Sequence, residues 1–357
     1  MTSLLLPSFL AHLADPSIRC VLLCGCGGGF DFVHALLLLP ELRRLGKDVV
    51  IGSYSFGQPA DIEGGTTVFS QQGVVAKMVS AQCRAPRHYG PEVHLCSFLD
   101  LREPAGAPHE VYAYYARAFT VPLLAELYRQ LIDAHGIDAV VLVDGGSDSL
   151  MVGDEEGLGD PVEDAVSVAA VASLNGLKAK VLLSIGLGSD RYNHVSDAAS
   201  LRAVAELTSS GAYLGAVSIE PRSEGFALYS SCLAHLDQRQ SFRSVLASNI
   251  RAAVQGGFGP AGSEGRAQDS VYLWPLMAMM FAFDVDKVAE RSLMAGWIRD
   301  CRSVLDCHLA VERGRRELGD NLRATEELPQ HAQWRGPGDH GWRPHHTKGI
   351  NARRSGG

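Results

Sequence analysis

Short apolar runs of strand length alternate along this chain with longer segments that have helical periodicity. Repeated strand–helix–strand units build a parallel sheet that is covered by helices on both faces. The alternation therefore predicts an α/β fold with a doubly wound, mainly parallel, Rossmann-like sheet. The runs with strand character lie at 18–23, 49–51, 93–98, 137–143, 177–185 and 213–219.

The part of the chain after about residue 220 has more helical character than the part before it. We expect one α/β domain over 1–327, with its core at 18–220 and a more helical part at 221–327. Residues 328–357 are polar and basic, which is typical of a disordered tail. Helices are expected at 32–45, 109–134, 198–207, 226–236, 241–254 and 284–318, with a further helix beginning near residue 160.

Composition and charge narrow the classes of protein to which the chain can belong. A formal charge of −8 disfavours nucleic acid as a partner. No run reaches the roughly 18 apolar residues of a membrane span, and the first fifteen residues lack the basic region of a signal peptide. The eight cysteines show no paired CxxC spacing that would indicate zinc. We therefore expect a cytoplasmic protein whose partner is a small molecule.

The loops that follow the expected strands are rich in glycine and in acidic residues. In a doubly wound sheet the carboxyl ends of the strands meet at one edge, and ligands bind there. We therefore expect these loops to lie together and to form a site. They are the segments 25–31, 52–57, 100–103, 144–156 and 186–190.

The first of these loops contains Gly25, Gly27, Gly28 and Gly29 and leads into an expected helix at Asp31. Backbone N–H groups at a helix start suit a phosphate, so these glycines are candidate ligand-binding residues. The loop matches neither a Walker loop nor the GxGxxG dinucleotide pattern. A carboxylate at Asp31 is also explained by the helix dipole, and it would repel a phosphate unless a cation intervened.

The loop after the strand at 137–143 carries a high density of negative charge. From residue 144 to residue 164 there are eight carboxylates and no Lys or Arg. Gly145 and Gly146 allow a ligand to approach the backbone closely. Hard oxygen donors suit Mg²⁺ or Mn²⁺, and paired carboxylates also accept hydrogen bonds from vicinal hydroxyls. The candidate metal ligands are Asp144, Asp148, Asp154 and Glu155, of which Asp144 and Asp148 are also candidate catalytic residues.

The end of the acidic segment has a simpler explanation than ligand binding. Asp160, followed by a proline and then by Glu163 and Asp164, is typical of a helix start. We therefore assign these three acids to capping and to the first helical turn. The alternative for the whole acidic segment is a solvated surface turn.

Three residues in other loops are weaker candidates. His194 is a candidate acid or base, although a single loop histidine commonly has neither role. Arg191 is a candidate clamp for an anion, because it would offset the acidic loop. Cys26 lies at a helix start that would lower the pKa of a thiol, but the sequence places no obvious base beside it.

Two motifs together suggest a known family. The segment GGGFD at 27–31 and the segment VDGGSDSLMVGDEEGLGDPVED at 143–164 resemble a bacterial and archaeal family known as a domain of unknown function, of the DUF1152 type. The resemblance covers about residues 18–315 and implies an α/β fold. It implies no reaction and carries over no catalytic residues.

Three functions are consistent with these observations. The first is an enzyme that acts on a phosphorylated, nucleotide-like or sugar-like small molecule, with Mg²⁺ as the candidate cofactor. The second is a non-catalytic protein that binds or senses a small molecule in the same cleft. The third is a nicotinamide-dependent oxidoreductase, which the missing third glycine at Phe30 and the absence of an acid at 52–53 disfavour.

Overall fold

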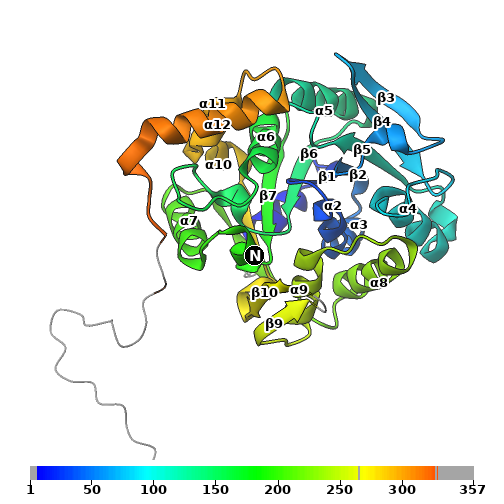
Figure 1. The fold of residues 1–357 in the computed structure, drawn as a ribbon. Helices are drawn as coiled ribbons and strands as arrows, with labels where there is room; N and C mark the ends of the chain where they lie inside the picture. Colours follow the sequence, from blue (N-terminus) through cyan, green and yellow to red (C-terminus); the bar gives the residue numbers. More distant parts are fainter. Residues whose placement is uncertain (1–5, 264–265, 326–327, 329–357) are drawn as a thin grey trace, which may run out of the picture. The chain divides into compact units, whose positions relative to one another are not determined.

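A nine-stranded sheet forms the centre of the protein in the computed structural model, which describes residues 6–263, 266–325 and 328 (Figure 1). Its strand order is β3-β4-β5-β2-β1-β6-β7-β11-β8, and a separate hairpin pairs β9 with β10. The strands are β1 (Cys20–Gly25), β2 (Asp48–Ser55), β3 (Thr66–Gln71), β4 (Val74–Ser80), β5 (Glu110–Tyr115), β6 (Ala139–Asp144), β7 (Ala179–Ile185), β8 (Tyr213–Ser218), β9 (Gly259–Ser263), β10 (Arg266–Leu273) and β11 (Met279–Asp284).

The predicted doubly wound, mainly parallel sheet is confirmed. The five strands β5, β2, β1, β6 and β7 are parallel neighbours, whereas β4 and β11 run antiparallel to the strands beside them. From β1 the chain moves to β2 on one side, and it later returns to place β6 on the other side. The order of the strands therefore reverses between β1 and β6, which is where a doubly wound sheet opens a crevice for a ligand.

Helices cover both faces of the sheet, and each face has its own apolar core. Along β1, Leu22 and Cys24 point into one core and Val21 and Leu23 into the other, as the two-residue period of a strand requires. The first core is covered by α5 (Val121–His135), α6 (Pro161–Ala172), α7 (Asp197–Ser209), α10 (Val285–Arg291), α11 (Leu293–Ile298) and α12 (Val304–Leu318). The second is covered by α1 (Ser8–Leu13), α2 (Asp31–His34), α3 (Leu39–Arg44), α4 (Pro91–Arg102), α8 (Glu224–Arg239) and α9 (Val245–Val254).

Two predictions of secondary structure were wrong. The run at 93–98, predicted as a strand, belongs to α4, which has Pro91 at its start and buries Val93, Cys96 and Leu99 at helical spacing. The predicted loop at 100–103 therefore ends a helix instead of a strand. The segment at 109–134, predicted as one helix, is divided into β5 and α5, because its tyrosine-rich first part forms a fully packed strand.

Two long predicted helices are interrupted. The segment 32–45 contains α2, a short 3-10 turn and α3, with Pro40 in the first turn of α3. The segment 284–318 contains α10, α11 and α12, and the hydroxyls of Ser292 and Ser303 cap the second and third of these helices. The more helical part of the chain also supplies β11 to the central sheet. The predicted tail lies outside the described residues, apart from Leu328.

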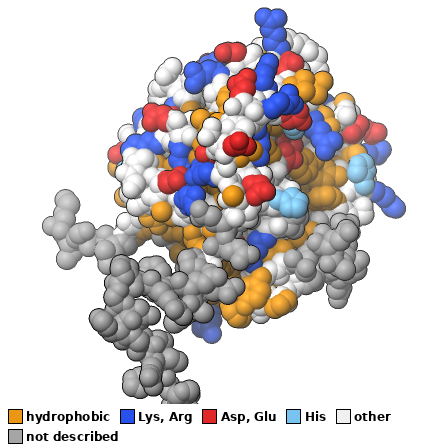
Figure 2. All heavy atoms as spheres, turned by 60° about the vertical axis from the view of Figure 1, so that its left-hand side comes forward, with side chains coloured by type: hydrophobic (Ala, Val, Ile, Leu, Met, Phe, Trp, Pro, Cys, Tyr) orange, Lys and Arg blue, Asp and Glu red, His pale blue; other side chains and the backbone are white. Residues whose placement is uncertain are grey.

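The surface of the molecule carries charges of both signs. On the face shown in Figure 2, Lys and Arg side chains are interspersed with Asp and Glu and do not gather in one basic patch. Among the described residues, no helix has the length and apolar content needed to cross a membrane.

Candidate functional site

A cleft opens at the reversal point between β1 and β6, at the sheet edge where the sequence predicts a site. The space within it is about 920 Å³, including the part that opens to solvent. The loop after β1, the loop after β6, the first turn of α6 and the loop after β7 all contribute to its walls. Seven carboxylic acids line the cleft: Asp31, Asp144, Asp148, Asp160, Glu163, Asp164 and Asp190.

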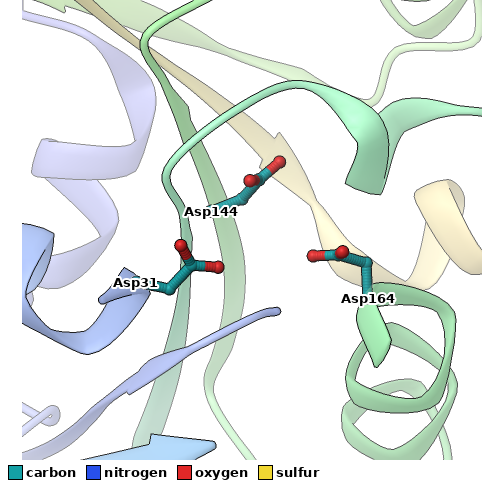
Figure 3. Close-up of side chains that lie close together, drawn as sticks. All are labelled: Asp31, Asp144 and Asp164. Atoms are coloured by element: carbon teal, nitrogen blue, oxygen red, sulfur yellow. The ribbon is translucent and has the colours of Figure 1, made fainter. Parts of the chain in front are cut away.

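Three of these acids form a compact group, which we call the carboxylate trio: Asp31, Asp144 and Asp164. One oxygen from each lies within 4.8 Å of the other two. Figure 3 shows the three side chains lying close together, from the start of α2, the end of β6 and the first turn of α6. All three side chains are buried, with exposed fractions between 3 and 7%.

The surrounding hydrogen bonds only partly satisfy the carboxylate trio. Asp31 accepts hydrogen bonds from the backbone N–H groups of Gly27 (2.9 Å) and Gly145 (3.1 Å). Asp144 accepts a short hydrogen bond from the hydroxyl of Ser149. The Oδ1 atom of Asp164 is buried and has no hydrogen-bond partner. The trio therefore offers a buried acceptor that lacks a donor.

Burial makes the charged forms of the carboxylate trio unfavourable. Removal from water raises the pKa of each of the three groups well above its ordinary value, and the negative charge of Asp148 raises them further. Buried carboxylates that lie this close together need either protons or a cation between them. The arrangement is therefore suited to holding a cation.

A second set of carboxylates surrounds the trio. Asp148 accepts a hydrogen bond from the backbone N–H of Asp160 (3.1 Å), and burial raises its pKa to about 6. Glu163 accepts from the N–H of Gly28 (3.2 Å), and burial, together with the charge of Asp160, raises its pKa to about 8. Asp190 accepts a hydrogen bond of 2.6 Å from the N–H of Ser147. Two of these groups thus titrate near neutral pH.

The N–H groups of three glycines in the first loop are not free to bind a phosphate. The N–H of Gly27 is bound to Asp31, that of Gly28 to Glu163, and that of Gly29 to the carbonyl of Tyr54 (3.2 Å). Gly25 ends β1, where a Cβ would lie 3.1 Å from the backbone nitrogen of Phe32. The protein's own carboxylates take the positions that the sequence prediction reserved for an anion.

The two glycines of the second loop also make room for buried side chains of the site. A Cβ on Gly145 would lie 2.4 Å from Nε2 of His34, and one on Gly146 would lie 2.3 Å from Oδ2 of Asp190. These glycines allow buried side chains from other segments to approach the backbone. His34 is itself buried and hydrogen-bonded through Nδ1 to the hydroxyl of Tyr229 (2.9 Å), and burial lowers its pKa to about 3.

Two predicted metal ligands lie outside the cleft. Asp154 pairs with Arg323 at 2.6 Å. Both carboxylate oxygens of Glu155 accept backbone hydrogen bonds from the turn at 152–153, and the side chain also pairs with Arg323 at 3.3 Å. Of the predicted metal set, only Asp144 and Asp148 line the cleft. Asp154 and Glu155 instead fix the turn to the C-terminal part of the chain.

The remaining predicted residues also have structural surroundings. Arg191 pairs with Asp197 at 2.7 Å, and its guanidinium lies 4.8 Å from the ring centre of Trp274, so it does not offset the acidic loop. His194 adopts a positive φ of 68° and lines a smaller, separate pocket. Cys26 is fully buried, and burial together with the charge of Asp164 raises the pKa of its thiol well above the ordinary value.

The sequence prediction did not assign Asp164, Glu163 and Asp160 to the site, and it included Asp190 only as the last residue of the expected site loop at 186–190. The first three do lie at the start of α6, yet the side chain of Asp160 makes no capping hydrogen bond. A general rule could have assigned the acids of α6 to the site, because the helix that follows a parallel strand begins at the edge where that strand ends. Carboxylates in the first turn of such a helix can therefore face the ligand.

The chain belongs to the family described as "Protein of unknown function (DUF1152)", whose model matches residues 22–315. The match includes both glycine loops and every residue of the carboxylate trio. No curated protein and no solved structure matches the chain.

Proposed function

Because the description of the family names no reaction, we propose a function from the site itself: a divalent-cation-dependent enzyme that acts on a small molecule in the cleft. The carboxylate trio, Asp31, Asp144 and Asp164, would hold Mg²⁺ or Mn²⁺. The observation that supports this proposal most directly is the buried Oδ1 of Asp164, an acceptor without a donor beside two further buried carboxylates. Hard oxygen ligands of this kind suit these two ions.

A bound divalent cation would polarise a substrate oxygen or lower the pKa of a bound water. The protein supplies the proton-transfer group beside it. Asp148 is the best candidate for that role, because its pKa of about 6 lets it exchange a proton near neutral pH. Burial in a cleft beside the trio would also strengthen its interactions with the reacting group.

The class of substrate follows from the charges in the cleft. Since the glycine N–H groups are already occupied, a phosphorylated or nucleotide-like substrate would reach the site through the cation. A sugar-like substrate would direct hydroxyls at the remaining carboxylates. A nicotinamide dinucleotide has less support, because the ring of Phe56 covers Gly28 and Gly29, where its pyrophosphate would lie.

The cation site can be tested by comparing two carboxylates from the same loop-rich region. Mn²⁺ binding would be measured by calorimetry on the wild-type chain, on Asp164→Asn and on Asp154→Asn. We expect Asp164→Asn to weaken binding by at least about tenfold, since loss of even an outer-shell partner has that effect. Asp154→Asn should bind normally because Asp154 lies in the ion pair with Arg323.

The opposite ranking of the two variants, or a wild-type chain that binds no Mn²⁺ or Mg²⁺, would contradict the cation site. Catalysis is tested separately by incubating the chain and Mg²⁺ with phosphorylated, nucleotide and sugar compounds and following products by mass spectrometry. Binding with full recovery of the unchanged compound would favour a non-catalytic, ligand-sensing protein.

A further inference from the structure

A partly exposed aromatic ring lies at the cleft. The ring of Phe56 lies against the glycine loop, with ring carbons 2.1 and 2.7 Å from the points where Gly28 and Gly29 would carry a Cβ. The hydroxyl of Tyr89 donates to the carbonyl of Gly29 (3.1 Å) and lies 3.4 Å from the N–H of Phe56. Phe56 nevertheless remains 40% exposed and lines the cleft. One part of the ring is packed and the rest is available to a ligand.

A carboxylate lies directly beside this ring. An oxygen of Glu163 is 2.6 Å from the same Gly28 position that the Phe56 ring approaches to 2.1 Å. The absence of a side chain at residue 28 therefore brings an aromatic ring and a carboxylate together. A ring next to a carboxyl group attracts an organic cation, through the ring quadrupole and through hydrogen bonds to the carboxyl oxygens, and a bound cation would favour the ionised form of Glu163.

A second aromatic ring is also partly exposed at the cleft. Phe242 is also 40% exposed and lines the cleft. It packs edge-on against Tyr89 with ring centres 5.3 Å apart, and it lies 5.7 Å from Phe30. Its backbone N–H donates to the carbonyl of His88 (3.0 Å), which fixes the loop that carries it. Each of the two exposed rings thus packs against other residues on one side. Both rings line a cleft whose polar side chains are mainly carboxylic acids.

The charged side chains that line the cleft favour some classes of ligand over others. The described lining contains seven carboxylic acids and one arginine, Arg243, so one divalent cation would still leave an excess of acidic groups. An anion is disfavoured there, whereas a cationic ligand would stabilise the ionised forms of these acids, which a neutral sugar would not. An ammonium group satisfies both the rings and the acids.

We propose that the small molecule acted on in this cleft carries an ammonium group, which binds against the exposed part of the Phe56 ring and the neighbouring carboxyl group of Glu163, with Phe242 as a second apolar wall. This inference rests on the proposed function, because it names the substrate class of the same site. The recognition elements are nevertheless separate from the carboxylate trio. Loss of one binding event can therefore be distinguished from loss of the other.

The test compares two probes with the same four-carbon chain, putrescine with ammonium end groups and 1,4-butanediol with neutral hydroxyl end groups, by calorimetry with the full chain in the presence of Mg²⁺. We expect putrescine to bind and butanediol not to bind. Phe56→Leu keeps an apolar side chain but removes the ring. It should weaken putrescine binding about two- to fivefold, the equivalent of a partly exposed cation–π contact of about 0.5–1 kcal/mol.

Phe258→Leu is the matched control, since Phe258 is 71% exposed and is not among the residues that line the cleft. It should leave putrescine binding unchanged, whereas Glu163→Gln should weaken it more than Phe56→Leu does. Phe242→Leu provides a second aromatic variant if Phe56→Leu does not fold. Equal binding of the two probes, or equal effects of Phe56→Leu and Phe258→Leu, would overturn the proposal.

The same variants separate this inference from the cation site. Phe56→Leu should retain Mn²⁺ binding at the carboxylate trio. A wild-type chain that binds Mn²⁺ but does not prefer putrescine over butanediol would refute the ammonium proposal alone. A chain that prefers putrescine but binds neither Mn²⁺ nor Mg²⁺ would refute the proposed cation dependence.

Discussion

Replacement of Glu163 by glutamine should change how the stability of the protein depends on pH. Burial and the nearby charge of Asp160 raise the pKa of Glu163 from 4.5 to about 8, while the side chain is only 8% exposed. The folded chain therefore holds a proton on this group over a range of pH in which the unfolded chain has released it. Stability from this group is present below pH 4.5 and is lost as pH rises toward 8.

The size of the change in stability follows from the interval between the two pKa values of Glu163, 4.5 and about 8. Each pH unit within it removes about 1.4 kcal/mol of unfolding free energy, so the loss between pH 5 and pH 8 is about 4 kcal/mol for this one group. Glutamine keeps the acceptor for the N–H of Gly28 but has no proton to lose. Glu163→Gln should therefore resemble the wild type at pH 5 and be more stable by about 4 kcal/mol at pH 8.

Urea unfolding followed by circular dichroism at several pH values, in buffer with a chelator and without amines, measures this difference. Glu312→Gln, at an exposed position of α12, is the control and should leave the pH dependence unchanged. A constant difference in stability between Glu163→Gln and the wild type across the range would refute the reasoning. It would mean that Glu163 loses its proton equally readily in the folded and unfolded chains.

Three further experiments test other parts of the structure. Gly145→Ala places a methyl group 2.4 Å from the His34 ring, and thermal melting should show a loss of about 1–3 kcal/mol together with weakened Mn²⁺ binding. Arg323→Met removes the cation that pairs with Asp154 and Glu155, so limited proteolysis should cut the 152–157 turn faster, whereas unchanged cutting would show that the pairs are dispensable. Cys26 should react with iodoacetamide only after unfolding, as followed by peptide mapping, and rapid modification of the native chain would contradict its burial.

The sequence predicts the central strands well because their burial leaves few alternatives. The runs that became β1, β6 and β7 are apolar on both faces and are followed by glycine, so they match a buried parallel strand. The run at 93–98 is short and rich in apolar residues like a strand, yet it lies in α4 after Pro91. For this segment, contacts with neighbouring helices and strands decide the secondary structure, and the local sequence pattern carries no information about those contacts.

In the candidate site, too, the positions of some residues follow from the local sequence, whereas others depend on partners far along the chain. Asp144 and Asp148 could be placed at the cleft from the rule for strand ends alone. Asp154 and Glu155 have the same chemistry only a few residues later, but Arg323, which lies 169 residues along the chain from Asp154, holds them elsewhere. Asp164 could be assigned to the first turn of a helix, whereas its direction depends on how α6 packs against the sheet. No local pattern distinguishes these cases.

The position of β11 has a consequence for how the protein folds during synthesis. This strand comes from residues 279–284 but lies between β7 and β8, which precede it in the chain. While the ribosome is still making the intervening segment, β7 and β8 both have an unpaired edge that can associate with other chains. The nascent protein therefore needs protection at this side of the sheet until nearly the whole domain has emerged. Aggregation during expression should accordingly be sensitive to substitutions in β11 that leave the cleft untouched.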